Sequence, residues 1–541
     1  MSQAVKNQSS YNVRNSLVNY YLLIMFTFFP IFLSNHYAHA RTDKFFLYLI
    51  LSGILIISTL CVSLAYINDK NSSSNTAGAS SSFKLSAPDI CFLLFFVFAA
   101  ISTLTSSHKL DSLSGNAGRN NGLILLLVYL LIYFILSRFY YYKEYVIIGY
   151  IVGSSLVAFL SDLHFFYIDP FGLLDGYSAD IVEDFASTIG NKNTIAAFMC
   201  LFLPVAIALF VISKKRYLKV TAGFGIFFAY TGLLTANSNS AFIGLAAVLC
   251  AMLIIFTRKF EYLRAYFLAL FIMFSSAKIL RLFSLMLHDN SKAFESIQQH
   301  LVYGKYAYIP IILCLAIYLI LTLFKGKIEC HYKAKPLKII FISLTALLFS
   351  ALLFAFIYFS VFDLKTDLGS FETLFRFNAK WGTHRGFMWI YGLKEYWNFD
   401  VVHKLLGSGP DTFYYVFEPY FQGLSDFGDT STDCIHNEYL NYLVTQGILG
   451  LLSYVSLLVA VLARSIKNSR NNPIIFLFMF SVISYAAQSV VNLYQPITTP
   501  IFFIFISLCE GLNRSNTNYV LASNINATNK KKKCRINTAQ K

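Results

Sequence analysis

Charged side chains are scarce in this sequence of 541 residues. Asp, Glu, Lys and Arg together make up only 13%, whereas soluble domains carry roughly a quarter. Hydrophobic residues make up 57%, and the mean hydropathy is clearly positive. Such a composition excludes an ordinary soluble fold, and most of the chain must face lipid or other apolar helices.

The alternating pattern of β-barrel strands is also missing. Apolar runs of about 16 to 25 residues recur instead from Leu17 to Leu512, each near the length that crosses a hydrocarbon core of roughly 30 Å. Because lipid offers no partner to an unpaired backbone N–H or C=O, such runs must form helices. The predicted fold class is therefore all-α, a polytopic transmembrane helical bundle of about fourteen spans, with twelve possible. The expected spans cover residues 17–34, 45–67, 88–105, 122–136, 145–160, 194–212, 218–234, 241–256, 262–279, 306–324, 337–362, 439–462, 474–490 and 497–512.

A cleavable signal peptide is not recognisable at the amino terminus. The run from Leu17 to Ser34 is long enough to span, and the junction after it lacks a small-x-small site, so this run is expected to remain as the first helix. The formal net charge is +16, but the basic residues lie in short loops and in the tail at 530–533, which is typical of an orientation signal. Contact with membrane lipids is therefore expected, and nucleic-acid binding is not.

Basic residues gather in alternate loops of the carboxy-terminal two thirds. The four basic turns hold Lys214, Lys215, Arg216 and Lys219; Arg258, Lys259 and Arg264; Lys325, Lys327, Lys333, Lys335 and Lys338; and Arg464, Lys467 and Arg470. The positive-inside rule places these turns and both termini in the cytoplasm. The chain then divides into a cytoplasmic amino terminus at 1–16, spans 1 to 11 at 17–362, a large extracytoplasmic loop at 363–437, spans 12 to 14 at 438–512 and a basic cytoplasmic tail at 513–541.

The loop at 363–437 is much longer than the other predicted connections between spans. All three tryptophans of the chain, Trp381, Trp389 and Trp397, lie in it, and this aromatic content argues against disorder. Ordered loops of such length are usually functional. We therefore expect this segment to fold over the outer ends of the helices.

Polar clusters fall on the same predicted face as this loop. They cover residues 118–122, 190–193, 235–240, 384–389, 407–410 and 436–440. Each cluster alone is weak evidence, because Gly and Asn at a helix end are commonly caps, and Gly407-Ser408-Gly409-Pro410 can be a plain turn. Their coincidence on one face is the main functional signal in the sequence.

In their order along the chain, these clusters resemble the motifs of the O-antigen ligase and O-antigen polymerase-like family. The resemblance covers roughly Arg119 to Gly450, and its most specific part is His436-Asn437-Glu438-Tyr439-Leu440 with the long loop before it. The family implies a glycosyltransferase that moves a glycan from an undecaprenyl diphosphate carrier to an acceptor hydroxyl. It also implies a multi-pass protein of the bacterial cytoplasmic membrane with its active face outside.

The resemblance implies roles for two residues of this chain. A loop arginine, here Arg385, would hold the diphosphate, and the loop-end histidine, here His436, would activate the acceptor hydroxyl. General chemistry agrees, because histidine supplies a base with a pKa near neutral and arginine offers a bidentate fork for a diphosphate. The chain has no Asp-x-Asp motif for a metal-bound sugar nucleotide, so we expect a reaction without metal or cofactor.

Further residues are expected at the donor site, and they are Arg119, Lys192, Asn191, Asn193, Asn239 and Glu438. The family usually has an arginine where this chain has Asn239. Another outer-face cation must then supply that charge, Lys192 first and Arg119 second. Structural roles stay open as well, since Glu438 can be a charge favoured at a helix start and Arg385 can pair with a nearby glutamate.

Two other classes of function remain open at this point. One is a flippase or transporter for lipid-linked oligosaccharide, and the other is a scaffold in an envelope complex. Ion-coupled carriers commonly place ionisable residues in mid-membrane, whereas the spans here are almost free of charge, with Lys278 and Glu510 near span ends. Ligase, polymerase and protein O-glycosyltransferase share the motif, so the acceptor can be a glycan, a lipid or a protein.

The topology itself is testable with reporter fusions. Fusions after residues 216, 333 and 468 should report a cytoplasmic position, because they follow basic turns, and fusions after residues 180 and 400 should report an external one. A cytoplasmic signal at residue 400 would place the long loop on the wrong side of the membrane for the reaction implied above.

Overall fold

The computed structural model describes residues 3–71, 84–115, 119–288, 290–369 and 372–515. The predicted tail at 513–541 lies almost entirely outside these residues. Helices dominate, and a two-residue strand pair, β1 (Phe185–Ala186) with β2 (Gly190–Asn191), runs antiparallel. The predicted all-α class is confirmed.

Every expected span overlaps a helix. Among the described residues, nine helices are long and apolar enough to cross a membrane by length and composition, and three shorter apolar helices accompany them. The helices at the expected spans are α1 (Gln3–Thr27), α2 (Ala40–Asn71), α3 (Ala87–Thr105), α5 (Leu123–Phe139), α6 (Glu144–Phe165), α8 (Lys192–Ile212), α9 (Arg216–Thr235), α10 (Ser240–Phe256), α11 (Phe260–Met286), α13 (Tyr308–Leu323), α15 (Ala334–Ile357), α21 (Glu438–Asn468), α22 (Ile475–Gln488) and a last helix over 499–515.

The first helix departs from its predicted bounds of 17–34. It begins at Gln3 and ends at Thr27, shortly before Pro30, which lacks a backbone donor and disfavours helical backbone at the preceding residue. The buried side chain of Lys44 closes this end of α1. Its Nζ donates hydrogen bonds to the carbonyl oxygens of Phe29 at 3.3 Å, Pro30 at 3.0 Å and Phe32 at 2.9 Å.

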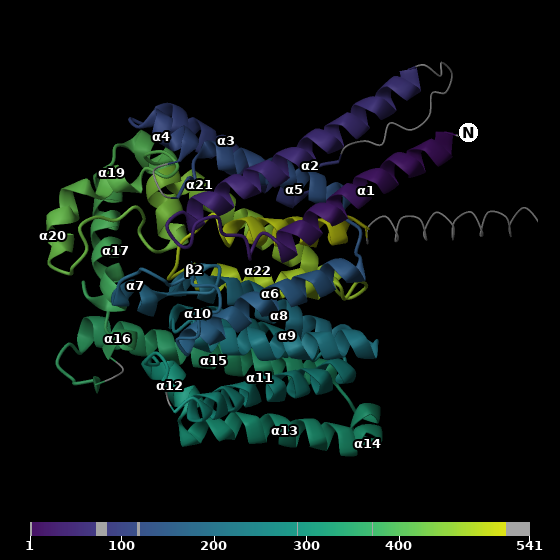
Figure 1. The fold of residues 1–541 in the computed structure, drawn as a ribbon, viewed down its shortest axis with the longest axis vertical. Coiled ribbons are helices and arrows are strands. Elements are labelled where there is room, and N and C mark those ends of the chain that lie inside the picture. Colours follow the sequence, from purple (N-terminus) through teal and green to yellow (C-terminus); the bar gives the residue numbers. More distant parts are fainter. Residues whose placement is uncertain (1–2, 72–83, 116–118, 289, 370–371, 516–541) are drawn as a thin grey trace, which may run out of the picture.

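The helix α8 lies at the centre of the bundle. Its most apolar stretch is 94% buried, as expected for a helix that is hydrophobic on all sides, and it packs against α9 and α22 (Figure 1). The helices α13 and α15 are the opposite case, because Cys314 is the one buried residue of α13 and α15 has none. These two helices present their apolar side chains outward, as lipid-facing helices do.

The two ends of the bundle differ in their connections. In Figure 1 the short helices α4 (Lys109–Ser114), α7 (Ala179–Asp184) and α12 (Ser296–Val302) gather at the left end, together with the helices of the long loop. The short helix α14 (Lys325–Cys330), in one of the basic turns, lies at the opposite end. The polar clusters singled out in the sequence therefore share one end of the bundle.

The long loop is folded. It contains α16 (Glu372–Phe375), α17 (Trp381–Asn398), α18 (Val401–Leu406), α19 (Phe413–Phe417) and α20 (Phe421–Ser425). Its hydrophobic core is separate from that of the bundle and contains Phe387, Met388, Tyr396, Phe413, Phe417, Leu424 and Ile435, joined by Val444 of α21. This core fixes the loop on the start of α21.

Part of this loop forms backbone hydrogen bonds with α21 at a break in that helix. Gly447 has a φ of 68° inside the helix, so the carbonyl groups before it are free to accept bonds from elsewhere. The backbone N–H of Ser408 donates to Val444 O at 3.1 Å, and that of Gly409 donates to Thr445 O at 2.8 Å. A Cβ at Gly447 would come within 2.3 Å of the Leu405 carbonyl. The glycines of the 407–410 cluster and of α21 thus allow two backbones to touch.

Candidate functional site

His436 lies on the last residues of the long loop, directly before α21. Its φ is 52°, in the left-handed region that non-glycine residues seldom adopt. The backbone on both sides is held, because Trp389 Nε1 donates to Ile435 O at 3.0 Å and the Asn437 side chain caps α21 by accepting from the N–H groups of Tyr439 and Leu440. These bonds keep the histidine in a conformation it would otherwise avoid.

Arg385 reaches the same place from α17. Gly382, Thr383 and His384 have left-handed backbone, so regular helix starts at Arg385. Residues four apart lie on one face of a helix, which puts Arg385 beside Trp389 and hence near the loop that carries His436. The Nη1 atom of Arg385 donates to Gly382 O at 2.6 Å, and its Nε atom is buried with no hydrogen-bond partner.

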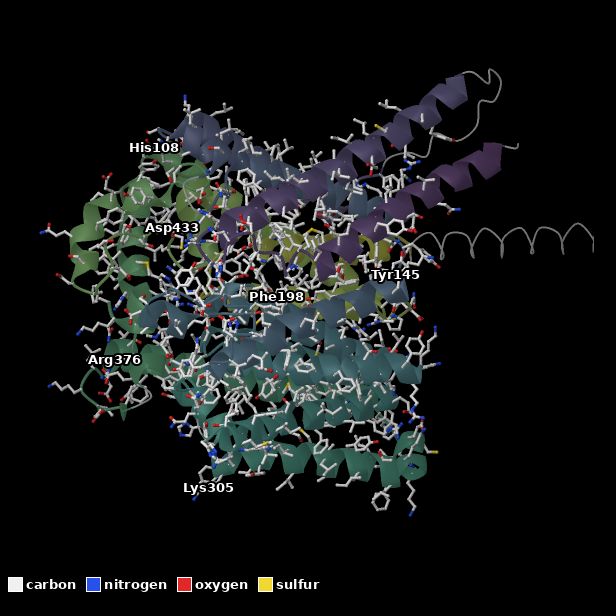
Figure 2. The ribbon with its side chains drawn as sticks, viewed as in Figure 1. His108, Tyr145, Phe198, Lys305, Arg376 and Asp433 are labelled. Atoms are coloured by element: carbon white, nitrogen blue, oxygen red, sulfur yellow. The ribbon has the colours of Figure 1, made fainter. Side chains whose placement is uncertain are left out.

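Arg119 comes from the polar cluster before α5. It is 6% exposed, and its Nη2 atom lies 2.5 Å from Oδ1 of Asp433, three residues before the histidine. Its Nε and Nη1 atoms are buried without a hydrogen-bond partner. Asp433 also forms an ion pair with Arg41, which lies in the first turn of α2. The distance between Arg41 Nη1 and Asp433 Oδ2 is 3.8 Å. Figure 2 labels Asp433, which lies where the long loop meets the bundle.

These charges determine the state of the histidine. Burial and then the charges of Arg385 and Arg119 lower the pKa of His436 to about 3, against the raising effect of Asp433. The imidazole is therefore neutral at neutral pH. For Asp433, burial alone would raise the pKa, but Arg119 outweighs that effect and the pKa is lowered, so the carboxylate is charged. The arrangement combines a neutral base with cations that can receive an anion.

The structure brings together three of the residues singled out in the sequence. His436 lies within electrostatic reach of both Arg119 and Arg385, although the three residues come from distant segments of the chain. Sequence reasoning missed Arg41 and Asp433. Arg41 falls between the first two expected spans, at 17–34 and 45–67, and only the folded contact with Asp433 reveals its place.

Among the described residues, no contact links Lys192 to the group around His436. Its Nζ pairs with Asp184 Oδ1 at 2.8 Å, so its charge is already matched. Asn239, where the family usually has an arginine, is exposed, and its amide lies 3.5 Å from Glu295 Oε2. The expected compensation by Lys192 therefore finds no support in this geometry, whereas the runner-up Arg119 does lie at the site.

Asn191 and Asn193 belong to a second polar cluster at the start of α8. The Asn191 side chain caps this helix by accepting from the Asn193 N–H at 2.9 Å. The Asn193 side chain accepts from Ser238 Oγ at 2.7 Å, and its carbonyl accepts from Asn492 at 3.2 Å. The next residue, Thr194, donates to Gln495 Oε1 at 2.8 Å. These residues join α8 to the connection at 489–498, a segment that sequence reasoning did not single out.

Glu438 is fully buried at the start of α21, two residues after the histidine. Its carboxylate accepts a hydrogen bond from Tyr454 at 2.6 Å, and its backbone N–H donates to Ser489 O at 3.0 Å. One turn further, Asn441 Nδ2 donates to the Tyr494 hydroxyl at 2.9 Å. Glu438 thus supports the connection at 489–498, and among the described residues its hydrogen-bond partners do not include the arginines.

Residues 301–455 match the family model described as O-antigen ligase. This match confirms the resemblance over the segment from the end of α12 into α21, which holds Arg385, His436 and Glu438. The family implies a membrane glycosyltransferase of the O-antigen ligase or polymerase type, which acts on lipid-linked glycans. The matched segment does not include Arg41 or Arg119. No curated protein matches the chain.

The depressed pKa of His436 predicts a specific dependence of stability on pH. The folded pKa of about 3 lies below the unfolded value of about 6.5, so the contribution of this residue is present above pH 6.5 and is lost as pH falls towards 3. His436→Asn removes the titrating imidazole and introduces a residue that tolerates left-handed backbone. The free energy of unfolding of the wild type should fall by about 1.4 kcal/mol more than that of this variant for each pH unit below about 6.5. Thermal unfolding of both proteins at pH 7 and pH 5 measures the difference, and parallel losses would contradict the assigned pKa.

Proposed function

We propose that this protein transfers a glycan from an undecaprenyl diphosphate carrier to an acceptor hydroxyl at the outer face of a bacterial cytoplasmic membrane. The observation that supports this most is that Arg119 and Arg385 both act on His436, while Arg41 joins Arg119 at the neighbouring Asp433. Asp433 pairs with two of these arginines, and no carboxylate of the described residues pairs with Arg385. The site therefore offers positive charge to an anionic group next to a neutral base.

The proposed reaction assigns one role to each kind of residue. The acceptor oxygen forms a bond to the anomeric carbon, and the bond from that carbon to the carrier phosphate breaks. The diphosphate leaves with the bonding electrons, and the arginines stabilise the charge that develops on it. His436 takes the proton of the attacking hydroxyl.

The charges of the site also suggest an order of events. In the free protein, burial together with the arginines holds the pKa of His436 at about 3, which makes it a weak base. A bound diphosphate carries negative charge that offsets the arginines, and this raises the pKa of His436 towards its usual value. The base thus becomes effective once the donor is in place, which protects the site from activating a hydroxyl without a donor.

The proposed base is tested by His436→Ala and by His436→Asn, the second of which also preserves the left-handed backbone. Both should lower transfer by about 10² to 10⁴ while the protein stays in the membrane, because a general base is lost. The assay follows glycan transfer in membranes supplied with purified undecaprenyl diphosphate-linked glycan. His403→Asn is the matched control, since His403 lies in the same loop and is bound to Asp400. Normal transfer by the His436→Asn variant would remove His436 as the base.

The proposed donor site is tested by comparing four cations. Arg41→Gln, Arg119→Gln and Arg385→Gln should each raise the donor concentration for half-maximal rate by about tenfold or more, the value of one charge-assisted hydrogen bond. Lys192→Gln should leave it nearly unchanged, because Asp184 already pairs with this lysine. Donor consumption in membranes is the measurement, with protein level checked alongside. If Lys192→Gln raised this donor concentration strongly and Arg41→Gln left it unchanged, Lys192 and not Arg41 would belong to the donor site.

A further inference from the structure

A second group of cations surrounds a cavity at the opposite end of the bundle. The cavity has a volume of about 380 Å³, and its lining includes Arg258, Lys259, Lys335, Lys338 and Arg470. They come from three places: the turn between α10 and α11, the first turns of α15, and the turn between α21 and α22. This is the end at which the basic turns lie, away from the long loop (Figure 1).

The positive charge of this cavity is not balanced by carboxylates of the described residues. Within the part of the chain that the structure describes, no carboxylate forms an ion pair with any of the five cations. Nearby acidic groups are already engaged, since Glu261 pairs with Arg264 and Lys325. Five like charges around one cavity repel one another, and an anion in the cavity would relieve this repulsion.

One of the cations is held in a fixed position. The Nη1 atom of Arg258 donates to Ser469 Oγ at 2.8 Å, and its Nη2 atom donates to Ile466 O at 3.2 Å. These bonds hold the guanidinium of Arg258 at the carboxy-terminal end of α21, close to the charge of Arg470. Three of the other four cations are lysines, of which Lys259 and Lys335 are exposed, and their flexible stems can close on a ligand.

The walls of the cavity favour an amphipathic ligand over a free ion. Tyr262 and Phe476 line it beside the cations. The helix α15 rises from the cavity with no buried residue, and Ile339 and Ile340, just after the two lysines, are 54% and 52% exposed. Acyl chains can therefore lie along α15 while a phosphate occupies the cavity.

We propose that this cavity binds the phosphate headgroup of an anionic phospholipid, with its acyl chains along α15. Inorganic phosphate shares the same charge chemistry but gains nothing from the apolar wall. The site is independent of the transfer reaction, because none of its residues lies at the end of the bundle that holds His436.

The experiment uses the full-length protein in detergent and counts bound lipid by native mass spectrometry. The probes are phosphatidylglycerol, zwitterionic phosphatidylcholine and inorganic phosphate as competitor. Lys335→Gln with Arg470→Gln removes one lysine and one arginine of the cavity, both exposed. Lys214→Gln with Arg216→Gln removes the same two charges from a basic turn outside the cavity lining.

We expect the wild type and the Lys214/Arg216 variant to bind phosphatidylglycerol in preference to phosphatidylcholine. The Lys335/Arg470 variant should bind phosphatidylglycerol about 30-fold more weakly, from the loss of two cations near a lipid phosphate. The pair Lys335→Arg with Arg470→Lys keeps both charges and should bind the lipid as the wild type does. Equal weakening by both glutamine pairs would mean a diffuse surface charge and overturn the site. Displacement of the lipid by an equal concentration of inorganic phosphate would overturn the choice of a lipid ligand.

Discussion

The arrangement of the end of the bundle that holds His436 depends on the backbone bonds that Gly447 makes possible. Its left-handed conformation releases the carbonyl groups of Val444 and Thr445 from α21, and these accept from the 408–409 backbone and, at Thr445, from Ser102 of α3. In a membrane such carbonyls need partners within the protein. One break in one helix therefore joins the long loop, α21 and α3, and it positions the loop that ends at His436.

Much of this structure follows from local features of the sequence. Apolar runs predicted spans that each overlap a helix of the described residues. The aromatic residues of the long loop indicated a folded segment, and Phe387, Phe413 and Phe417 form its core. The predicted bounds of 17–34 for the first span were wrong, because Pro30 disfavours helical backbone at the residue before it and α1 ends at Thr27. Arg385 and His436 were identified from motif order, and the family match covers both.

Other features depend on contacts between distant segments, and no local pattern contains them. Arg41 and Asp433 are 392 positions apart, and their proximity arises only from the packing of α2 beside the end of the loop. Lys192 has a positive charge on the same predicted face as the site, but its contact in the fold is with Asp184. Position on a face thus predicts which residues are available, whereas contacts between distant segments decide which of them meet at one site.

The uneven burial of the helices has a practical consequence for work outside the membrane. In detergent, α8 keeps all its protein neighbours, whereas α15 exchanges a bilayer for a micelle along its whole length. Spectroscopic signs of an intact core would report on α8 and say little about α15. Since α15 leads along the chain to the long loop that carries Arg385, the choice of detergent bears on the candidate site as well as on the bundle.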